Sequence, residues 1–163
     1  MIHNKYNLKF SLIIFILSLI ILHSCQNDVN VLKERNLILK LHEDQRTFHF
    51  EKNINGLVNM FSPNFHSIDR GQISKPSIAE SRSRFTKYFN IVDFIKWDDV
   101  KEPIVSFSND GSMAYTIVNK LVVLSYENEK LETVLDTTYY SWVSVYKKYN
   151  KDWKLDCIVS TIK

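Results

Sequence analysis

The chain has 163 residues, which is enough for one domain with a proper core. Hydrophobic residues make up 45% and charged residues 24%, and only three glycines and three prolines occur, so a disordered or loop-dominated chain is excluded. Without residues 1–24, 19 basic and 18 acidic residues remain, and no basic patch stands out. We therefore expect no nucleic-acid partner.

The first 24 residues have the pattern of an export signal. Lys5 and Lys9 precede an apolar run from Phe10 to Leu22, which is shorter than a membrane span. The run ends in Leu22-His23-Ser24-Cys25, which resembles a bacterial lipobox. The resemblance implies diacylglycerol on Cys25 and cleavage before it, with residues 25–30 as a tether to a domain at 31–163. The alternative is an uncleaved anchor; both predict a location in the cell envelope.

Residues Val31–Phe50 contain no Pro or Gly, and their apolar spacing predicts a long helix. Its inward stripe is predicted to contain Ile38, Leu41, Gln45 and Phe48. His42 and His49 flank this stripe. They lack the four-residue spacing of zinc helices and no Cys or His cluster completes a set, so we predict partly buried histidines and no metal site.

Shorter elements are predicted next. A second helix with Ile54, Leu57, Val58 and Phe61 on one face should be stopped by Pro63. A strand should follow over Asn64–Asp69, with a turn at Arg70-Gly71. Ser77-Ile78-Ala79-Glu80 is a capping-box pattern that predicts a third helix, and Phe94–Asp99 leads into a sheet.

The stretch Pro103–Lys163 predicts an antiparallel meander, because runs rich in β-branched and aromatic residues alternate with polar turns. The turns are expected at 109–111, 127–130 and 150–152, with Trp153 starting the last strand; Asp110-Gly111 is a strong hairpin signal. Cys157 lies among alternating apolar residues, so we predict a buried, inert thiol rather than a catalytic one.

Helices come first and strands later, so the predicted fold class is α+β. Four segments are similar to motifs of the nuclear transport factor 2-like superfamily, in its SnoaL-like and ketosteroid-isomerase-like branch. They are Gly56–Phe65, Ile68–Gly71, Ser108–Tyr115 and Lys151–Leu155 with Ser160. The resemblance spans about Val31 to Lys163 and implies a cone: helices packed on a strongly curved antiparallel sheet, around a cavity open at one end.

The same resemblance supplies candidate site residues. Ketosteroid isomerases use an Asp base and an oxyanion hole made of a Tyr and a protonated Asp. Asp69 falls on the base position and Gln45 on that of the Tyr, but the second Asp has no counterpart in the strand Ala114–Leu124, so this apparatus is incomplete. We expect Gln45 and Asp69 to face one cavity and to pair across it, with His49 near the mouth. Asp69 could equally be only a turn residue.

Polar and aromatic residues within the predicted strands have no assigned direction, because the register is not known from sequence. An aromatic stripe at strand spacing favours core or interface over a ligand platform. Some of the polar residues could point into the cavity. The aromatic residues are Tyr139, Tyr140, Trp142 and Tyr146, and the polar ones are Thr116, Lys120, Thr138 and Ser141.

Two functions of different classes follow from these patterns. The favoured one is a lipid-anchored envelope module without catalysis, which binds a small apolar ligand or a protein partner. The alternative is a cofactor-free acid/base enzyme of the isomerase, cyclase or dehydratase type that uses Asp69. Self-association into a homodimer through the sheet is a third prediction. No cofactor is expected in any of them.

Overall fold

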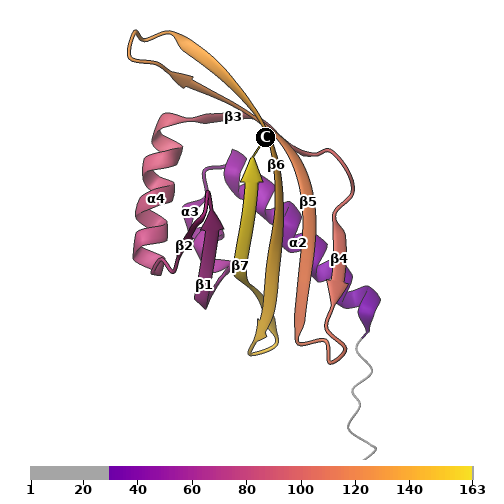
Figure 1. Cartoon of the computed structure of the whole chain (residues 1–163). Coiled ribbons are helices and arrows are strands. Elements are labelled where there is room, and N and C mark those ends of the chain that lie inside the picture. Colours follow the sequence, from indigo (N-terminus) through magenta and orange to yellow (C-terminus); the bar gives the residue numbers. More distant parts are fainter. Residues whose placement is uncertain (1–29, 163) are drawn as a thin grey trace, which may run out of the picture. The chain divides into compact units, whose positions relative to one another are not determined.

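A computed structural model of the chain describes residues 30–162. The leader, the lipidation site at Cys25 and most of the tether lie outside the described residues. Two helices, two strands and a third helix precede the remaining strands, so the sheet is built largely from the C-terminal half (Figure 1). None of these helices, all within residues 30–162, has both the length and the apolar character needed to cross a membrane.

The long helix α2 spans Val31–Phe50, as predicted, and lies across one face of the sheet (Figure 1). Its inward face differs from the predicted stripe by about one residue. Ile38, His42 and Gln45 are buried, whereas Leu41 and Phe48 are only half-buried. The helix therefore directs more polar side chains toward the sheet than its apolar pattern indicated.

The second helix is shorter than predicted. Helix α3 spans Ile54–Asn59, and Phe61 already belongs to strand β1, Phe61–Asp69. Pro63 therefore lies within a strand and does not stop the helix. The ladder between β1 and β7 shifts register between Phe61 and His66, so the missing N–H of Pro63 falls where regular pairing is interrupted.

The Arg70-Gly71 turn and the capping box are confirmed. Both turn residues have positive φ, and they lead into β2, Gln72–Ser74, a strand too short to be predicted. Helix α4 spans Ile78–Ile91. Its cap residue Ser77 accepts a hydrogen bond from the backbone N–H of Glu80, whose side chain accepts one from the backbone N–H of Ser77.

The remaining strands are β3 (Asp93–Asp99), β4 (Ile104–Phe107), β5 (Met113–Glu127), β6 (Thr133–Tyr149) and β7 (Asp152–Ile162). The sheet has the order β2-β1-β7-β6-β5-β3, and β4 also pairs with β5. The pairs β3–β5, β4–β5, β5–β6 and β6–β7 are antiparallel. Strand β1 runs parallel to β7, so the sheet is mixed rather than purely antiparallel. The predicted α+β class is confirmed.

The hairpin turns are where the sequence predicts them. Residues 109–111 connect β4 to β5, with Gly111 at φ +65°, and residues 150–151 precede β7. Trp153 is the second residue of β7 and is buried. The side chain of Asn128 closes the β5–β6 turn by accepting hydrogen bonds from the backbone N–H groups of Lys130 and Glu132.

A bulge in β7 overturns the prediction for Cys157. The ladder between β6 and β7 shifts register beside Tyr146, so that Tyr146 pairs with Leu155 and Val145 with Cys157. Asp156 is the extra residue and is buried, while Cys157 is placed on the outer face and is half-buried. Alternation of facing counted from Leu155 would turn Cys157 inward, but the extra residue of the bulge reverses the facing of the residues after it. Burial still raises the pKa of the Cys157 thiol, which disfavours the reactive thiolate.

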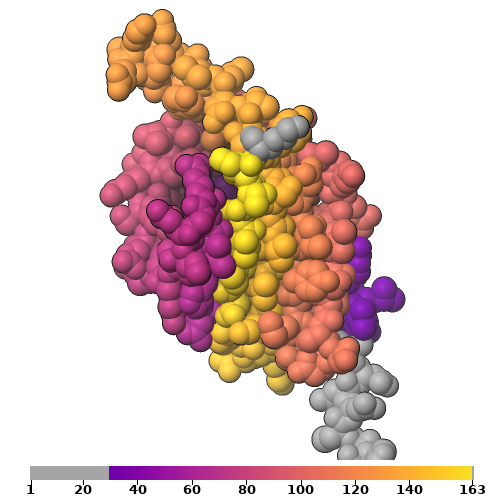
Figure 2. Space-filling model, in the orientation of Figure 1, coloured from indigo at the N-terminus to yellow at the C-terminus, as the bar shows by residue number. Residues whose placement is uncertain are grey.

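The outer face of the sheet carries a row of β-branched side chains. No helix covers this face in the view of Figure 2. Cross-strand pairing places one aliphatic residue from each of six strands side by side, and four of the six are exposed. We call this the aliphatic row; it consists of Ile104, Ile117, Val143, Val159, Ile68 and Ile73.

The bulged Asp156 should be a major stabilising residue of the sheet. Its carboxylate accepts hydrogen bonds from Ser62 (2.7 Å) and Tyr149 (2.9 Å) and lies 2.9 Å from Nζ of Lys147. We predict that Asp156→Ala lowers the free energy of unfolding by about 2–3 kcal/mol, because two hydroxyls lose their buried partner. Urea denaturation measures this, with the exposed Asp152→Ala as the control that should be neutral.

The loss of unfolding free energy in Asp156→Ala should depend on pH. Burial raises the pKa of Asp156, but the hydrogen bonds from Ser62, Lys147 and Tyr149 outweigh it and hold the pKa below its ordinary value of 3.8. The stabilisation is therefore complete above pH 3.8 and is lost as the pH falls through the lower folded value. An Asp156→Ala effect that grew on acidification would contradict this account.

Candidate functional site

A cavity of about 540 Å³ lies between the inner face of the sheet and helices α2, α3 and α4. This volume is in the range of small-molecule sites. Seven of its eighteen lining residues are aromatic, and the rings come from β1, α4, β3 and β6. They belong to Phe61, Phe65, Phe85, Tyr88, Trp97, Tyr140 and Trp142.

All three predicted site residues line this cavity. They do not form the predicted pair. The amide nitrogen of Gln45 donates to the hydroxyl of Tyr146 (3.4 Å), whereas Asp69 accepts from Ser160 (3.3 Å). Each polar group thus has its own partner on the strand beside it, so a contact across the cavity is not required. Whether any of the three acts on a ligand remains a prediction.

Asp69 ends strand β1, as predicted, and its side chain is 45% exposed. Arg70 Nε lies 3.6 Å from its second carboxylate oxygen. A carboxylate becomes a strong base when burial in an apolar pocket destabilises its charge. Asp69 instead has a neighbouring cation and contact with solvent, so its setting suits a hydrogen-bond acceptor at the cavity's edge.

His49 lines the cavity and is surrounded by aromatic rings. Its ring stacks on Trp97 with centroids 4.5 Å apart and meets Phe85, Phe89 and Phe94 edge-on. Nδ1 lies 2.6 Å from the carbonyl oxygen of Gln45. Burial among these rings lowers the pKa of His49 to about 4, so the imidazole is neutral near pH 7.

Behind Trp97 lies a charge cluster in which Lys120 and His42 are buried and Asp99 is partly exposed. Nζ of Lys120 is 4.1 Å from the centre of the Trp97 ring and 2.8 Å from Asp99, and the Lys120 side chain is only 1% exposed. Nε2 of His42 lies 2.9 Å from the other oxygen of Asp99. A carboxylate oxygen can only accept, so Nε2 carries the proton, and Nδ1 of His42 has no hydrogen-bond partner among the described residues.

The cluster's two bases are both held toward their neutral forms. Burial lowers the pKa of Lys120, although Asp99 opposes this. Burial also lowers the pKa of His42, with the charge of Lys120 acting in the same direction. The cluster therefore has one carboxylate shared by two groups, and Asp99 is the residue on which both depend.

Sequence patterns did contain a signal for this cluster. On β5 the buried positions alternate strictly, and Lys120 occupies one of them between Val118 and Val122. On α2 the residues Ile38, His42, Gln45 and His49 follow steps of four, three and four, which is a helical face. The sequence analysis placed Gln45 on the inward stripe and left the direction of Lys120 open, and it did not connect His42 with Lys120.

Two buried side chains in the cavity wall, Ser81 and Trp142, have polar atoms without a hydrogen-bond partner among the described residues: Oγ of Ser81 and Nε1 of Trp142. Tyr88 and Arg84 add a hydroxyl and a guanidinium from α4. Burial raises the pKa of Tyr88 to about 12, so its hydroxyl stays protonated. The cavity is apolar with a few polar groups at separate positions.

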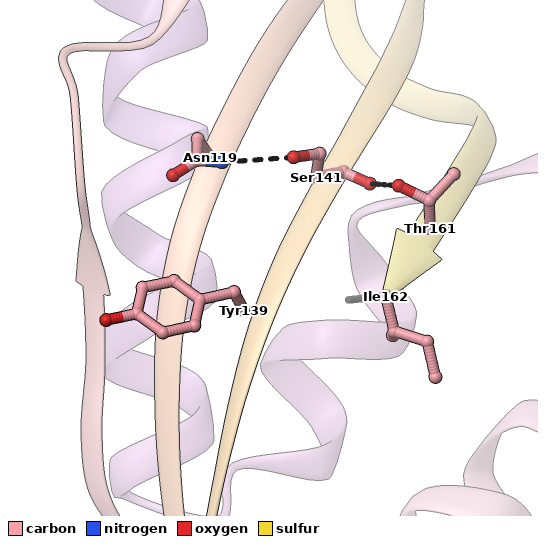
Figure 3. A pocket seen from close by; sticks show the side chains of 5 residues that line it. All are labelled: Asn119, Tyr139, Ser141, Thr161 and Ile162. Carbon is pink, nitrogen blue, oxygen red and sulfur yellow. Dashed lines mark hydrogen bonds between the residues drawn. The ribbon is translucent and has the colours of Figure 1, made fainter.

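Other polar strand residues lie on the opposite face. Ser141 accepts a hydrogen bond from Asn119 (3.0 Å) through its hydroxyl and from Thr161 (3.3 Å) through its carbonyl, in a depression of about 310 Å³ (Figure 3). Tyr139 borders this depression, whereas Tyr140, Trp142 and Tyr146 face inward. Across residues 30–162, no group of three or more His, Cys, Asp or Glu side chains is arranged to hold a metal.

This fold and cavity define the chain as a cone-shaped α+β protein with an aromatic internal site. The fold is that of the nuclear transport factor 2-like proteins. A hexachlorocyclohexane dehydrochlorinase is similar over 84% of this chain and 90% of its own (TM-score 0.66, 13% identity). A nuclear transport factor 2-like protein from Cytophaga hutchinsonii is similar over 79% of this chain and 98% of its own (TM-score 0.63, 15% identity). A ketosteroid isomerase-like protein from Erwinia carotovora atroseptica is similar over 78% of this chain and 94% of its own (TM-score 0.62, 12% identity).

These identities show a common fold and no more. No protein-family model matches the sequence, and a search of curated proteins found no match. The function must therefore be argued from the side chains of this chain.

Asp99 should stabilise the fold far more than its neighbour Asp98. We predict that Asp99→Asn lowers the free energy of unfolding at pH 7 by about 2–3 kcal/mol, because the buried ammonium of Lys120 loses its counter-charge. Asp98→Asn is the matched control: its partner Arg46 lies 3.2 Å away and both side chains are about 40% exposed, so the loss should stay under about 1 kcal/mol.

The Asp99→Asn loss should shrink as the pH rises. Without the carboxylate the pKa of Lys120 falls further, so the folded protein releases a proton that the unfolded chain retains, and stability increases with pH in that window. Urea denaturation at pH 7 and pH 9 tests this. Equal losses for the two variants would show that the cluster does not stabilise the fold.

Proposed function

We propose that this protein is a binding module for a small, largely apolar ligand that occupies the cavity between the sheet and its helices. The observation that carries this proposal is the composition of the wall. Seven aromatic rings surround a space of about 540 Å³, and most of the polar groups are single atoms at separate positions. Such a surface gains free energy from burying an apolar molecule, and the polar atoms orient it.

The acid/base enzyme is the less favoured alternative. It requires a base in a dry setting beside the substrate, and Asp69 is half-exposed with Ser160 and Arg70 as neighbours. His49 is neutral and lines the cavity, but its low pKa makes it a weak base. These features support binding without turnover.

We further propose that the module works at the cell envelope, held by a lipid on Cys25. The support is the sequence pattern of residues 1–25 alone. Pairing of two copies through the outer sheet face is proposed on the aliphatic row, since contiguous exposed apolar surface is typical of interaction sites. The row and the cavity lie on opposite faces of the sheet, so a dimer would leave the cavity free.

Binding can be tested with naphthalene as an apolar probe. We predict chemical-shift changes in NMR spectra for residues of the cavity wall. Ser67→Phe should weaken the binding at least about tenfold, because a phenyl ring on this half-buried wall residue fills part of the cavity. Ser83→Phe, on the exposed side of α4, is the control that should bind normally. Absence of naphthalene binding by the unmodified protein would refute the proposal.

Lipid attachment is tested separately in cells. Metabolic labelling with a fatty-acid analogue should mark the protein, and Cys25→Ala should abolish the label. Cys157→Ala should leave it unchanged, because the half-buried thiol of Cys157 lies within a strand of the folded domain. Label that persists in Cys25→Ala would exclude this residue as the anchor.

A further inference from the structure

The protonation of His49 can be derived from its contacts. Nδ1 lies 2.6 Å from the carbonyl oxygen of Gln45, and a carbonyl can only accept a hydrogen bond. Nδ1 therefore carries the proton. In the neutral imidazole, Nε2 then holds a lone pair and can only accept.

The ring cannot easily turn to change this assignment. It is stacked on Trp97 and bordered by Phe85, Phe89 and Phe94, and its Nδ1–H is held by the helix backbone. Nε2 lies on the ring edge opposite the helix bond. Among residues 30–162, no side chain or backbone group forms a hydrogen bond with Nε2, and His49 lines the cavity.

Lys120 adds an electrostatic constraint. Its ammonium rests on the Trp97 ring, 4.1 Å from the ring centre, and is held there by Asp99. Trp97 is also the ring on which His49 stacks. A second positive charge on His49 would be placed close to this ammonium in surroundings of low polarity, where repulsion is strong. The cluster thus opposes formation of an imidazolium at the cavity wall.

We propose that the cavity selects neutral ligands that direct a hydroxyl or N–H donor to Nε2 of His49, and that Lys120 is the positioning residue that preserves this acceptor. A carboxylate would need a donor at the same point and is disfavoured there; the charged groups elsewhere on the wall are Arg84 on α4 and Asp69 at the end of β1. An ether or ketone of the same shape leaves Nε2 without a partner. This inference rests on the proposed binding function and specifies the chemistry of its ligand.

Naphthalene and three of its derivatives test which class of ligand the unmodified protein binds. Naphthalene measures apolar burial alone, 2-naphthol adds a donor, 2-methoxynaphthalene replaces the donor with an acceptor, and 2-naphthoate adds a negative charge. By NMR or calorimetric titration at pH 7, we expect 2-naphthol to bind roughly fivefold more tightly than naphthalene and 2-methoxynaphthalene, in line with one hydrogen bond. 2-Naphthoate should bind more weakly than 2-naphthol.

Two variants assign the preference to the proposed residues. His49→Phe keeps a ring on Trp97 but removes the acceptor, so the ratio of the 2-naphthol affinity to the naphthalene affinity should fall from about five to about one. Lys120→Met removes the charge behind Trp97. In this variant the pKa of His49, followed by NMR, should rise above about 4, while burial still holds it below 6.5, and 2-naphthoate should gain affinity relative to 2-naphthol as the pH falls through the raised value.

Lys120→Met leaves Asp99 without its cation and could impair folding, so the double variant Lys120→Met with Asp99→Asn provides the same measurement with the charges balanced.

Failure of the proposed function and failure of the donor selectivity give different results. If no probe binds, the proposed function is wrong. If naphthalene binds but 2-naphthol shows no advantage, or keeps its advantage in His49→Phe, the binding module stands and the donor selectivity is overturned. An unchanged His49 titration in the double variant would remove Lys120 from the account.

Discussion

Burial of one ammonium group constrains this structure more than any other interaction. Lys120 extends from the middle of β5 into the space between the sheet and α2, where its side chain is 1% exposed. An unpaired charge there would cost several kcal/mol. Asp99 on β3 supplies the counter-charge, His42 on α2 shares it, and Trp97 covers the ammonium with its ring. Helix α2, the edge strand β3 and its neighbour β5 are thereby fixed relative to one another.

That arrangement connects the stability of the fold to the properties of the cavity. Trp97 contacts the charge cluster and carries the stacked ring of His49. The same residues that compensate the buried charge therefore determine which way a wall imidazole faces and whether it is charged. Structural and functional roles of polar residues are difficult to separate in such a small core, because each buried polar group needs a partner and partners are few.

The bulge in β7, an interior strand between β1 and β6, has a comparable effect elsewhere in the sheet. It buries Asp156 against Ser62, Tyr149 and Lys147, and it places Cys157 on the outer face. Beyond the bulge, Ile158 packs on the core and Val159 joins the aliphatic row. One extra residue thus decides which side chains of the last strand line the interior and which form a surface for association.

The sequence alone determined the α+β class, the long first helix, the capping box of α4 and the hairpin turns, because these depend on local periodicity and on residues with special backbone preferences. It also predicted Gln45, His49 and Asp69 as pocket residues, from the inward stripe of the first helix and from a family resemblance. Only the tertiary structure decided the partners. The Lys120–Asp99–His42 cluster joins residues 21 to 78 positions apart, and the β7 bulge depends on pairing with two other strands. Neither long-range pairing nor register is encoded in local pattern, so the chemistry of the site emerged only with the fold.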